Sequence, residues 1–248
     1  MSQFLQGAIS AACEIIPLLN TRAKELMVLG SKGAGGDTSI GADLMCEELF
    51  CKHLLSVANI DSEESGFIKS AHKNKDIIIL DPLDGSDNYL SNIPYFGASL
   101  ALCDQNGTIK EAIVINFCTG EAFYDGIKQN NVQKIHIFTN TQLPIRATTP
   151  KCGVFEKAYC NPKIAKKLYK HHIKFRSLGA GALSLAYALE NNFLLFGGNI
   201  RKYDVKAGLF LCRGLEIAHK KDFLLVSQNK KVFGMIARIL WDKNHLRH

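Results

Sequence analysis

The sequence has little proline and glycine, with 6 and 20 copies among 248 residues. Collagen-like and low-complexity chains need much higher contents of these residues, so both classes are excluded. Hydrophobic residues make up 47% of the chain, charged residues make up 21%, and the mean hydropathy is +0.01. A chain of this length and balance can bury a full core without disulfide or metal staples. The composition therefore predicts an ordinary globular protein and excludes intrinsic disorder.

The eight cysteines lack the spacing of a metal site. None belongs to a C-x-x-C pair, and no histidine lies at zinc-finger distance from any of them, so a structural zinc site is not expected. The N-terminal segment has no basic leader and no small-residue cleavage site, and no apolar run reaches the ~18 residues that a membrane span needs. We therefore expect reduced thiols, a cytoplasmic location and no membrane partner.

Basic residues outnumber acidic ones by 30 to 23, which gives a formal net charge of +7. This excess favours an anionic partner, which leaves nucleic acid, phosphorylated metabolites and acidic surfaces open. The densest basic stretch is 163–176, with Lys163, Lys166, Lys167, Lys170, Lys174 and Arg176. A basic nucleic-acid-binding protein is therefore the alternative to an enzyme. Because aromatic residues are sparse in this stretch, a solvated helix face is the preferred interpretation, and a nucleic-acid partner is not expected.

Apolar periodicity predicts two helices at the start of the chain. The first covers residues 2–29, with Pro17 as a possible kink, and the second covers 42–57. The glycine-rich stretch 31–36 breaks the pattern between them, and a polar turn is expected at 61–66.

Strands are predicted in the middle of the chain. The continuous apolar run 77–80 predicts a strand buried on both faces that ends at Asp81-Pro82. Asn106-Gly107 is a hairpin signal between two further runs. An antiparallel meander is therefore expected, with strands at 96–103, 109–117, 121–124 and 134–138.

The second half alternates between helix and strand. Asn161-Pro162 begins a helix to about Lys170, and a second helix is expected at 181–192. A strand at 193–196 precedes a helix that Asp204 caps and that runs to Cys212. No internal repeat and no linker interrupts the chain. We therefore expect one α/β domain over 1–248, with closely packed halves of about 1–128 and 129–248.

The densest chemical signal is the run Asp81-Pro82-Leu83-Asp84-Gly85-Ser86. It places two carboxylates at the end of a buried strand, followed by a turn that exposes backbone N–H groups. Carboxylate oxygens suit Mg²⁺, and free N–H groups at a helix start suit phosphate. The alternative is that this run is only a turn. Further acids lie at Asp37, Asp43, Glu63-Glu64 and Asp204, and together they are enough for a two-metal phosphate site.

These motifs resemble, in order and spacing, the inositol monophosphatase superfamily of Mg²⁺-dependent, lithium-sensitive phosphomonoesterases. The motifs are Asp37-x₅-Asp43, Glu63-Glu64-Ser65-Gly66, Asp81-Pro82-Leu83-Asp84-Gly85-Ser86-x-Asn88 and Asp204-x₂-Ala207-Gly208. The resemblance is good from about 31 to 125 and thinner from 176 to 214. It implies an α/β fold, an α+β layered sandwich with the alternating helix and sheet layers of inositol monophosphatase and fructose bisphosphatase. It also implies a homodimer.

The resemblance also assigns residues to a metal site and a phosphate site. The implied metal ligands are Glu63, Asp81, the Leu83 carbonyl, Asp84 and Asp204, for two or three Mg²⁺ ions. Asp84, Gly85 and Ser86 are the implied phosphate-binding residues.

The implied mechanism is direct attack by metal-activated water, without a covalent phosphoenzyme. Glu63 and the Ser86 hydroxyl would activate this water, and Asp43 would orient Ser86. The resemblance also implies that Lys32 and Asp37 fall in a mobile loop that helps to order a further metal ion.

One motif departs from the family pattern. The family's Trp-Asp-x-Ala-Ala-Gly is here Tyr203-Asp204-Val205-Lys206-Ala207-Gly208, so the aromatic residue and the aspartate are kept while a small residue is replaced by lysine.

The sequence motifs of competing enzyme classes are absent. The glycine-rich stretch is not G-x-x-x-x-G-K-[ST], and no G-x-S-x-G elbow is present. The spacing of Asp81 and Asp84 also differs from that of aspartyl-phosphate phosphatases.

The sequence thus predicts a Mg²⁺-dependent phosphomonoesterase that acts on a small ester such as inositol monophosphate or a sugar phosphate. Inositol-selective relatives carry a glutamate seven residues before the C-terminal metal aspartate, where this chain has Gly197. Arg201 and Lys202 lie just before Asp204, and such cations suit a second phosphate, although both could simply face solvent. The alternative activities are therefore fructose 1,6-bisphosphatase and 3′(2′),5′-bisphosphate nucleotidase.

Overall fold

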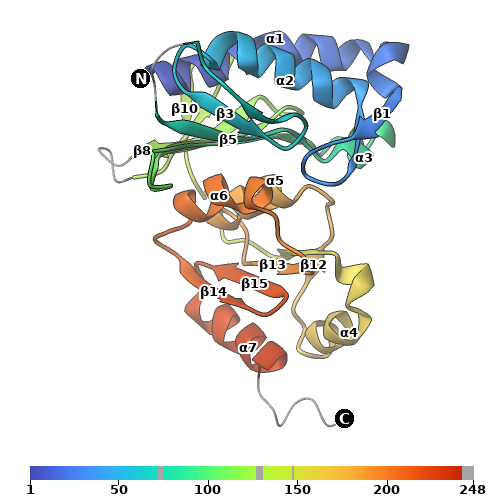
Figure 1. Ribbon diagram of the computed structural model, residues 1–248. Helices are drawn as coiled ribbons and strands as arrows, with labels where there is room; N and C mark the ends of the chain where they lie inside the picture. The colour runs from blue at the N-terminus through green and yellow to red at the C-terminus, as the bar shows by residue number, and fades with distance from the viewer. Residues whose placement is uncertain (72–74, 127–130, 147, 242–248) are drawn as a thin grey trace.

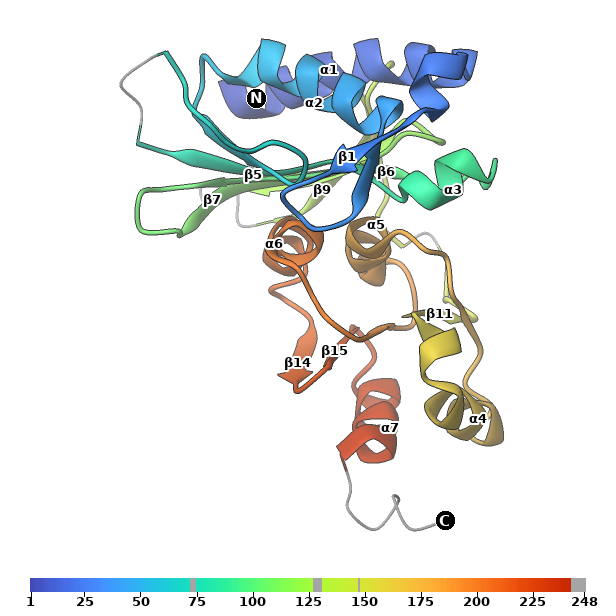
Figure 2. The ribbon, with the colours of Figure 1, turned by 45° about the vertical axis from the view of Figure 1, so that its right-hand side comes forward.

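The computed structural model describes residues 1–71, 75–126, 131–146 and 148–241, and within them helices and sheets alternate in layers (Figure 1). A pair of long helices covers an eight-stranded sheet, and two shorter helices cover the sheet's other face. A five-stranded sheet and a last pair of helices follow (Figure 2). The predicted α/β layered sandwich is confirmed. The expected boundary between the halves, at 128–129, lies outside the described residues.

The first helix, α1, spans Gln3–Thr21 and contains Pro17. Its N-terminus is capped by Ser2, whose hydroxyl accepts a hydrogen bond from the Leu5 N–H. The prediction of one helix over 2–29 is wrong at its C-terminal end. Arg22 adopts a left-handed conformation with φ of 49°, which ends the helix, and a short 3₁₀ turn, η1 (Lys24–Met27), follows.

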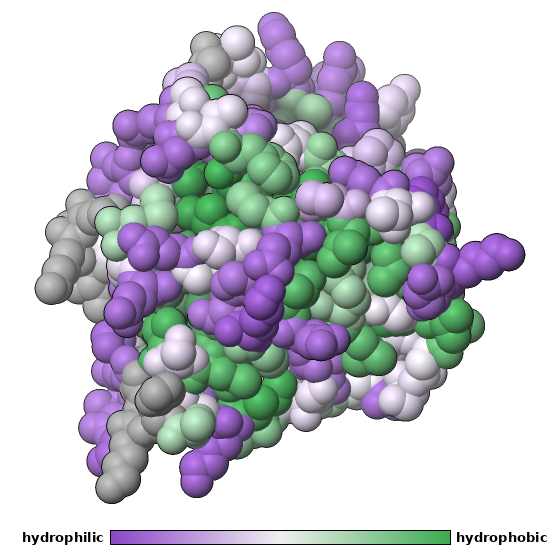
Figure 3. All heavy atoms as spheres, turned by 90° about the horizontal axis from the view of Figure 1, so that it is seen from above, coloured by the Kyte–Doolittle hydropathy of each residue, from purple (hydrophilic) through white to green (hydrophobic). Residues whose placement is uncertain are grey.

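Among the described residues, α1 alone is long and apolar enough to cross a membrane by length and composition. The core helix of a globular protein passes the same test, and eight residues of α1 are buried in the fold. In a view down onto this helix layer, apolar patches of surface alternate with polar side chains (Figure 3).

The second helix, α2, spans Gly41–Leu54, close to the predicted 42–57. Two short strands, β1 (Leu29–Lys32) and β2 (Thr38–Ile40), pair antiparallel on either side of the glycine-rich loop. This hairpin was not predicted. Its β2 strand leads directly into α2, where the Asp43 carboxylate accepts a hydrogen bond from the Ile40 N–H at 2.7 Å.

The eight-stranded sheet has the order β10-β9-β8-β7-β6-β5-β3-β4. Its antiparallel run from β5 to β10 contains the predicted meander, which is confirmed. The expected polar turn at 61–66 is in fact the tip of a β3–β4 hairpin. The strand bounds are β3 Asn59–Ser62, β4 Gly66–Ile68, β5 Ile77–Asp84, β6 Gly97–Cys103, β7 Ile109–Asn116, β8 Glu121–Gly126, β9 Gln133–His136 and β10 Thr141–Leu143.

Strand β5 is buried on both faces, as predicted. Ile78 and Leu80 pack toward α1 and α2, while Ile79 packs in the second core, beside α5 and α6. The prediction that the strand ends at Asp81-Pro82 is wrong, because β5 continues to Asp84. Its pairing with β6 is irregular between Asp81 and Asp84, where Pro82 has no N–H to donate. A short helix, α3 (Ser86–Leu90), follows directly.

The second sheet has the order β12-β11-β13-β15-β14. The helix predicted at 181–192 is shorter, since α5 becomes a 3₁₀ turn after Ala186. Asp204 is not the cap of its helix, because α6 already begins at Lys202. The bounds are β11 Gly153–Glu156, η2 Ala158–Cys160, α4 Pro162–Lys170, β12 Phe175–Arg176, α5 Gly181–Ala186, η3 Tyr187–Leu189, β13 Leu194–Gly197, α6 Lys202–Leu211, β14 Glu216–Lys220, β15 Phe223–Ser227 and α7 Lys230–Trp241.

Candidate active site

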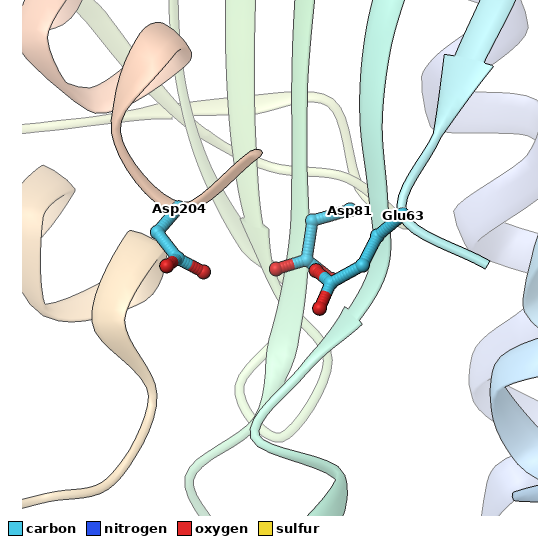
Figure 4. A group of neighbouring side chains, drawn as sticks. All are labelled: Glu63, Asp81 and Asp204. Atoms are coloured by element: carbon cyan, nitrogen blue, oxygen red, sulfur yellow. The ribbon is translucent and has the colours of Figure 1, made fainter. Parts of the chain in front are cut away.

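Three carboxylates from three different elements converge between the first sheet and the helix layer of α5 and α6. Glu63 comes from the β3–β4 turn, Asp81 from β5 and Asp204 from the first turn of α6, and their side chains point toward one another (Figure 4). One oxygen of each lies within 4.8 Å of the others, and all three residues are buried. We call these three residues the carboxylate cluster. A close set of oxygen ligands of this kind suits a hard divalent cation such as Mg²⁺.

The electrostatics of the cluster also favour a cation. Burial, together with the neighbouring acids and against the opposing effect of the Arg201 guanidinium, raises the pKa of Glu63 to about 7 and the pKa of Asp81 well above its ordinary value. Burial likewise raises the pKa of Asp84 to about 8, although a backbone hydrogen bond from Leu183 opposes this shift. Buried acids that resist ionisation are stabilised as carboxylates when a cation lies among them. The residues present therefore fit a metal ion.

Asp84 and Leu83 line the same pocket from the end of β5. The Asp84 carboxylate accepts the Leu183 N–H at 2.7 Å, so it ties β5 to the first turn of α5. The Leu83 carbonyl oxygen lies 3.0 Å from the Ser86 hydroxyl oxygen. Both residues thus lie at the pocket wall, beside the carboxylate cluster.

Ser86 and Asp43 form a hydrogen-bonded pair. The Ser86 hydroxyl donates to Asp43 Oδ1 at 2.6 Å, and Asp43 Oδ2 is held by the Ile40 N–H. Gly85, with φ of 93°, makes the turn between β5 and α3, where a Cβ would lie 3.1 Å from the Tyr95 carbonyl oxygen. Asp43, Gly85 and Ser86 all line the pocket.

The glycine-rich loop packs on the Glu63 turn. The N–H groups of Ala34 and Gly35 donate to the carbonyls of Glu64 and Glu63 at 2.8 and 2.6 Å. Asp37 lies at the pocket rim, with its side chain 82% exposed. Lys32 is exposed on β1 and lies outside the pocket wall. The structure thus brings Asp37, but not Lys32, to the pocket.

Arg201 and Lys202 take different directions. Arg201 lines the pocket and pairs with Asp37, Glu63 and Asp204. Lys202 pairs instead with Asp61, and its Nζ lies 4.8 Å from the Tyr203 ring centroid. Lys202 is outside the pocket wall, so the two neighbouring cations are not a joint anion site in this arrangement.

The pocket has a volume of about 420 Å³, and the sequence did not predict one of its walls. Glu156, Lys157 and Tyr159 contribute to this wall from the end of β11 and the turn after it. Glu156 accepts hydrogen bonds from the Ser184 hydroxyl and the Gly179 N–H. The only available signal was that charged residues follow an apolar run at 153–155, because ligands tend to bind at the carboxyl ends of strands.

The basic stretch begins on α4, in the last layer of the molecule, and ends with Arg176 on β12. Lys163, Lys166 and Lys170 are exposed, while Leu168 is buried on the opposite face of the helix. This arrangement agrees with a solvated helix face.

Known proteins resemble the chain in both sequence and fold. The model of the inositol monophosphatase family matches residues 1–215. A fructose-1,6-bisphosphatase of Pyrococcus furiosus is 30% identical over 72% of this chain and 68% of its own. A fructose-1,6-bisphosphatase/inositol-1-monophosphatase of Methanocaldococcus jannaschii is 24% identical over 81% and 77%. The crystal structure of extragenic suppressor protein suhB from Bartonella henselae covers 98% of this chain and 100% of its own, with a TM-score of 0.77 and 21% identity.

Proposed function

The chain belongs to the inositol monophosphatase family, and on this premise we propose that it hydrolyses a small phosphorylated metabolite in a Mg²⁺-dependent reaction. The family consists of metal-dependent phosphatases, and its members are phosphoric monoester hydrolases. The observation that carries the proposal is the convergence of Glu63, Asp81 and Asp204 from three elements onto one point beside the Ser86 turn.

Mg²⁺ would be held by Glu63, Asp81, the Leu83 carbonyl, Asp84 and Asp204. When bound, it would supply Lewis-acid chemistry, lowering the pKa of water and offsetting charge on the phosphoryl group. Glu63 would take the proton of the attacking water, because a cation among the buried acids keeps its side chain in the carboxylate form that a general base needs.

The Ser86 hydroxyl would orient the attacking water, and Asp43 would fix the direction of that hydroxyl through its 2.6 Å hydrogen bond. Gly85 and Ser86 would contact the phosphate from the turn into α3. Because water attacks directly, no phosphate becomes bound to a side chain, and acid-quenched enzyme should carry none.

For the substrate, we propose a preference for bisphosphates, such as fructose 1,6-bisphosphate or a 3′,5′-nucleotide, over inositol 1-phosphate. Arg201 and Lys157 place two cationic side chains on the pocket wall, and a guanidinium suits a second phosphate better than a neutral polyol. At Gly197, a side chain would meet Asn161 Nδ2 at 2.6 Å, so an inositol-binding glutamate does not fit there without rearrangement. The similar protein of Pyrococcus furiosus, which is named a fructose-1,6-bisphosphatase, supports the same direction, whereas the name of the Methanocaldococcus jannaschii protein includes both activities.

The test compares kcat/KM for the three substrates in the wild type, Arg201→Ala, Lys202→Ala and the double variant. We expect the wild type to favour a bisphosphate, and Arg201→Ala to lose at least about tenfold on it, as expected for a charged hydrogen bond. Lys202→Ala is the matched control. It removes the same charge from a side chain that pairs with Asp61 outside the pocket wall, so it should change kcat/KM little. A wild type that favours inositol 1-phosphate, or a double variant that keeps full activity on bisphosphates, would refute the preference.

We further propose that the protein is a cytoplasmic homodimer, with no membrane or nucleic-acid partner. The resemblance supports the dimer, and eight free thiols support a reducing compartment. Light scattering should give twice the chain mass of 27.4 kDa. A mass equal to one chain at micromolar concentration would contradict the dimer.

A further inference from the structure

The Arg201 guanidinium lies among the acidic side chains of the pocket. Its Nη1 donates to Asp37 Oδ2 at 2.7 Å and to Glu63 Oε1 at 2.5 Å. Its Nη2 and Nε donate to the two oxygens of Asp204 at 3.0 and 3.1 Å. One planar cation therefore joins the glycine-rich loop, the β3–β4 turn and α6, which lie far apart in the sequence.

Two of these partners belong to the carboxylate cluster. The guanidinium engages both oxygens of Asp204 and one oxygen of Glu63, in the geometry that makes arginine a strong ligand of carboxylates. A divalent ion held by the cluster would draw on the same two carboxylates. In addition, two cations a few ångströms apart in a poorly solvated site repel each other strongly.

The arginine can move away without losing every partner. Asp37 belongs to the loop at the pocket rim, and its exposed carboxylate can follow the guanidinium outward. The Arg201 side chain itself is 29% exposed, so a path to solvent is open beside it.

We propose that Arg201 is an internal counter-cation: it neutralises the carboxylate cluster of the metal-free protein and withdraws from Glu63 and Asp204 when a divalent cation binds. This inference rests on the proposed metal dependence. It makes Arg201 a positioning residue that lowers the affinity for the metal while stabilising the metal-free fold, and metal loading then frees the guanidinium for an anionic substrate group.

A purely structural role for Arg201 predicts the opposite effect on metal binding. If the arginine only fastened α6 to the Glu63 turn, its removal would loosen the cluster and weaken the binding of a metal ion. The sign of the change in metal affinity therefore separates the two roles.

The experiment is calorimetric titration of Mg²⁺ into the full chain without substrate, for the wild type, Arg201→Gln, Arg201→Lys and Lys202→Gln. We expect Arg201→Gln to bind Mg²⁺ at least about tenfold more tightly than the wild type, as expected when a close like charge is removed. Arg201→Lys keeps the positive charge but not the planar guanidinium, so its Mg²⁺ affinity should lie between those of the wild type and Arg201→Gln. Lys202→Gln removes the neighbouring charge outside the pocket and should shift the affinity less than about threefold.

Thermal unfolding gives a second readout. Arg201→Gln should melt below the wild type in EDTA and gain more in melting temperature when Mg²⁺ is added. Equal or weaker Mg²⁺ binding by Arg201→Gln and Arg201→Lys, both folded by circular dichroism, would overturn the inference and leave the phosphatase proposal standing. Absence of Mg²⁺ binding in all four proteins would refute the metal dependence and the inference with it.

Discussion

Asp84 has both a structural role and a place in the candidate active site. Its carboxylate accepts the Leu183 N–H while the residue lines the pocket at the end of β5. An asparagine at this position keeps the oxygen that accepts this hydrogen bond and loses the negative charge. The substitution therefore separates folding from metal binding.

We predict that Asp84→Asn lowers kcat by about a hundredfold or more, because it removes charge from the site where phosphate and metal meet. Its melting temperature in EDTA should stay close to that of the wild type. Steady-state phosphate release and circular dichroism measure the two quantities. A folded variant that keeps more than about a tenth of the wild-type kcat would show that Asp84 is not a metal ligand.

Asp43 predicts a pH dependence of stability. Burial raises its pKa from 3.8 to about 7, although hydrogen bonds from Ser86 and Ile40 act in the opposite direction. Between about pH 4 and pH 7 the folded state therefore keeps a proton that the unfolded state has lost, so stability falls as the pH rises. Asp84, with a pKa of about 8, has the same sign.

We predict that the metal-free protein loses about 3 kcal/mol or more in free energy of unfolding between pH 4.5 and pH 8, from pKa shifts of this size. Urea unfolding in EDTA at a series of pH values measures it. The Asp43→Asn variant stays neutral throughout and should show a shallower fall. The same slope in both proteins would exclude Asp43 as a source of the pH dependence.

At the scale of elements, the end of β5 depends on a close approach of its neighbours. Gly97 of β6 pairs with Asp84, and a Cβ at Gly97 would lie 2.0 Å from the Ile115 carbonyl oxygen of β7. A backbone atom cannot yield as a flexible side chain can, so any larger residue must push β6 and β7 apart. This glycine therefore sets the position of the strand that carries the site.

We predict that Gly97→Ala destabilises the protein by about 2 kcal/mol or more, as expected for overpacking, and lowers kcat because Asp84 moves with its pairing partner. Gly234→Ala in α7 is the matched control, because nothing lies within 4 Å of its Cβ position. That change should stabilise the helix by about 0.5–1 kcal/mol. Thermal unfolding of both variants measures the difference, and equal melting temperatures would contradict the argument.

Over the whole molecule, the sequence was most informative where chemistry and local pattern coincide. The apolar run before Asp81 predicted a doubly buried strand, and the order of the acidic motifs led to the family whose model matches 1–215. The Asn106-Gly107 turn and the apolar runs around it predicted the meander. The strand, the meander turn and each single acidic motif are signalled within a few residues.

The remaining features depend on contacts between distant segments. The order of the second sheet, with β15 between β13 and β14, leaves no mark in any single strand. The hydrogen bond from Arg201 to Glu63 joins residues 138 positions apart. The part of the pocket wall that contains Lys157 comes from a segment without a recognisable motif. Such contacts form only after the layers have packed, so local periodicity cannot reveal them.

The most direct test of the account is phosphate release by the purified protein from fructose 1,6-bisphosphate, a 3′,5′-nucleotide and inositol 1-phosphate. Each substrate is assayed with Mg²⁺, after EDTA, and after Mg²⁺ is restored. We predict release from at least one substrate with Mg²⁺, loss of that release with EDTA and full recovery when Mg²⁺ returns. Release that persists in EDTA, or no release from any of the three substrates with Mg²⁺, would contradict the account.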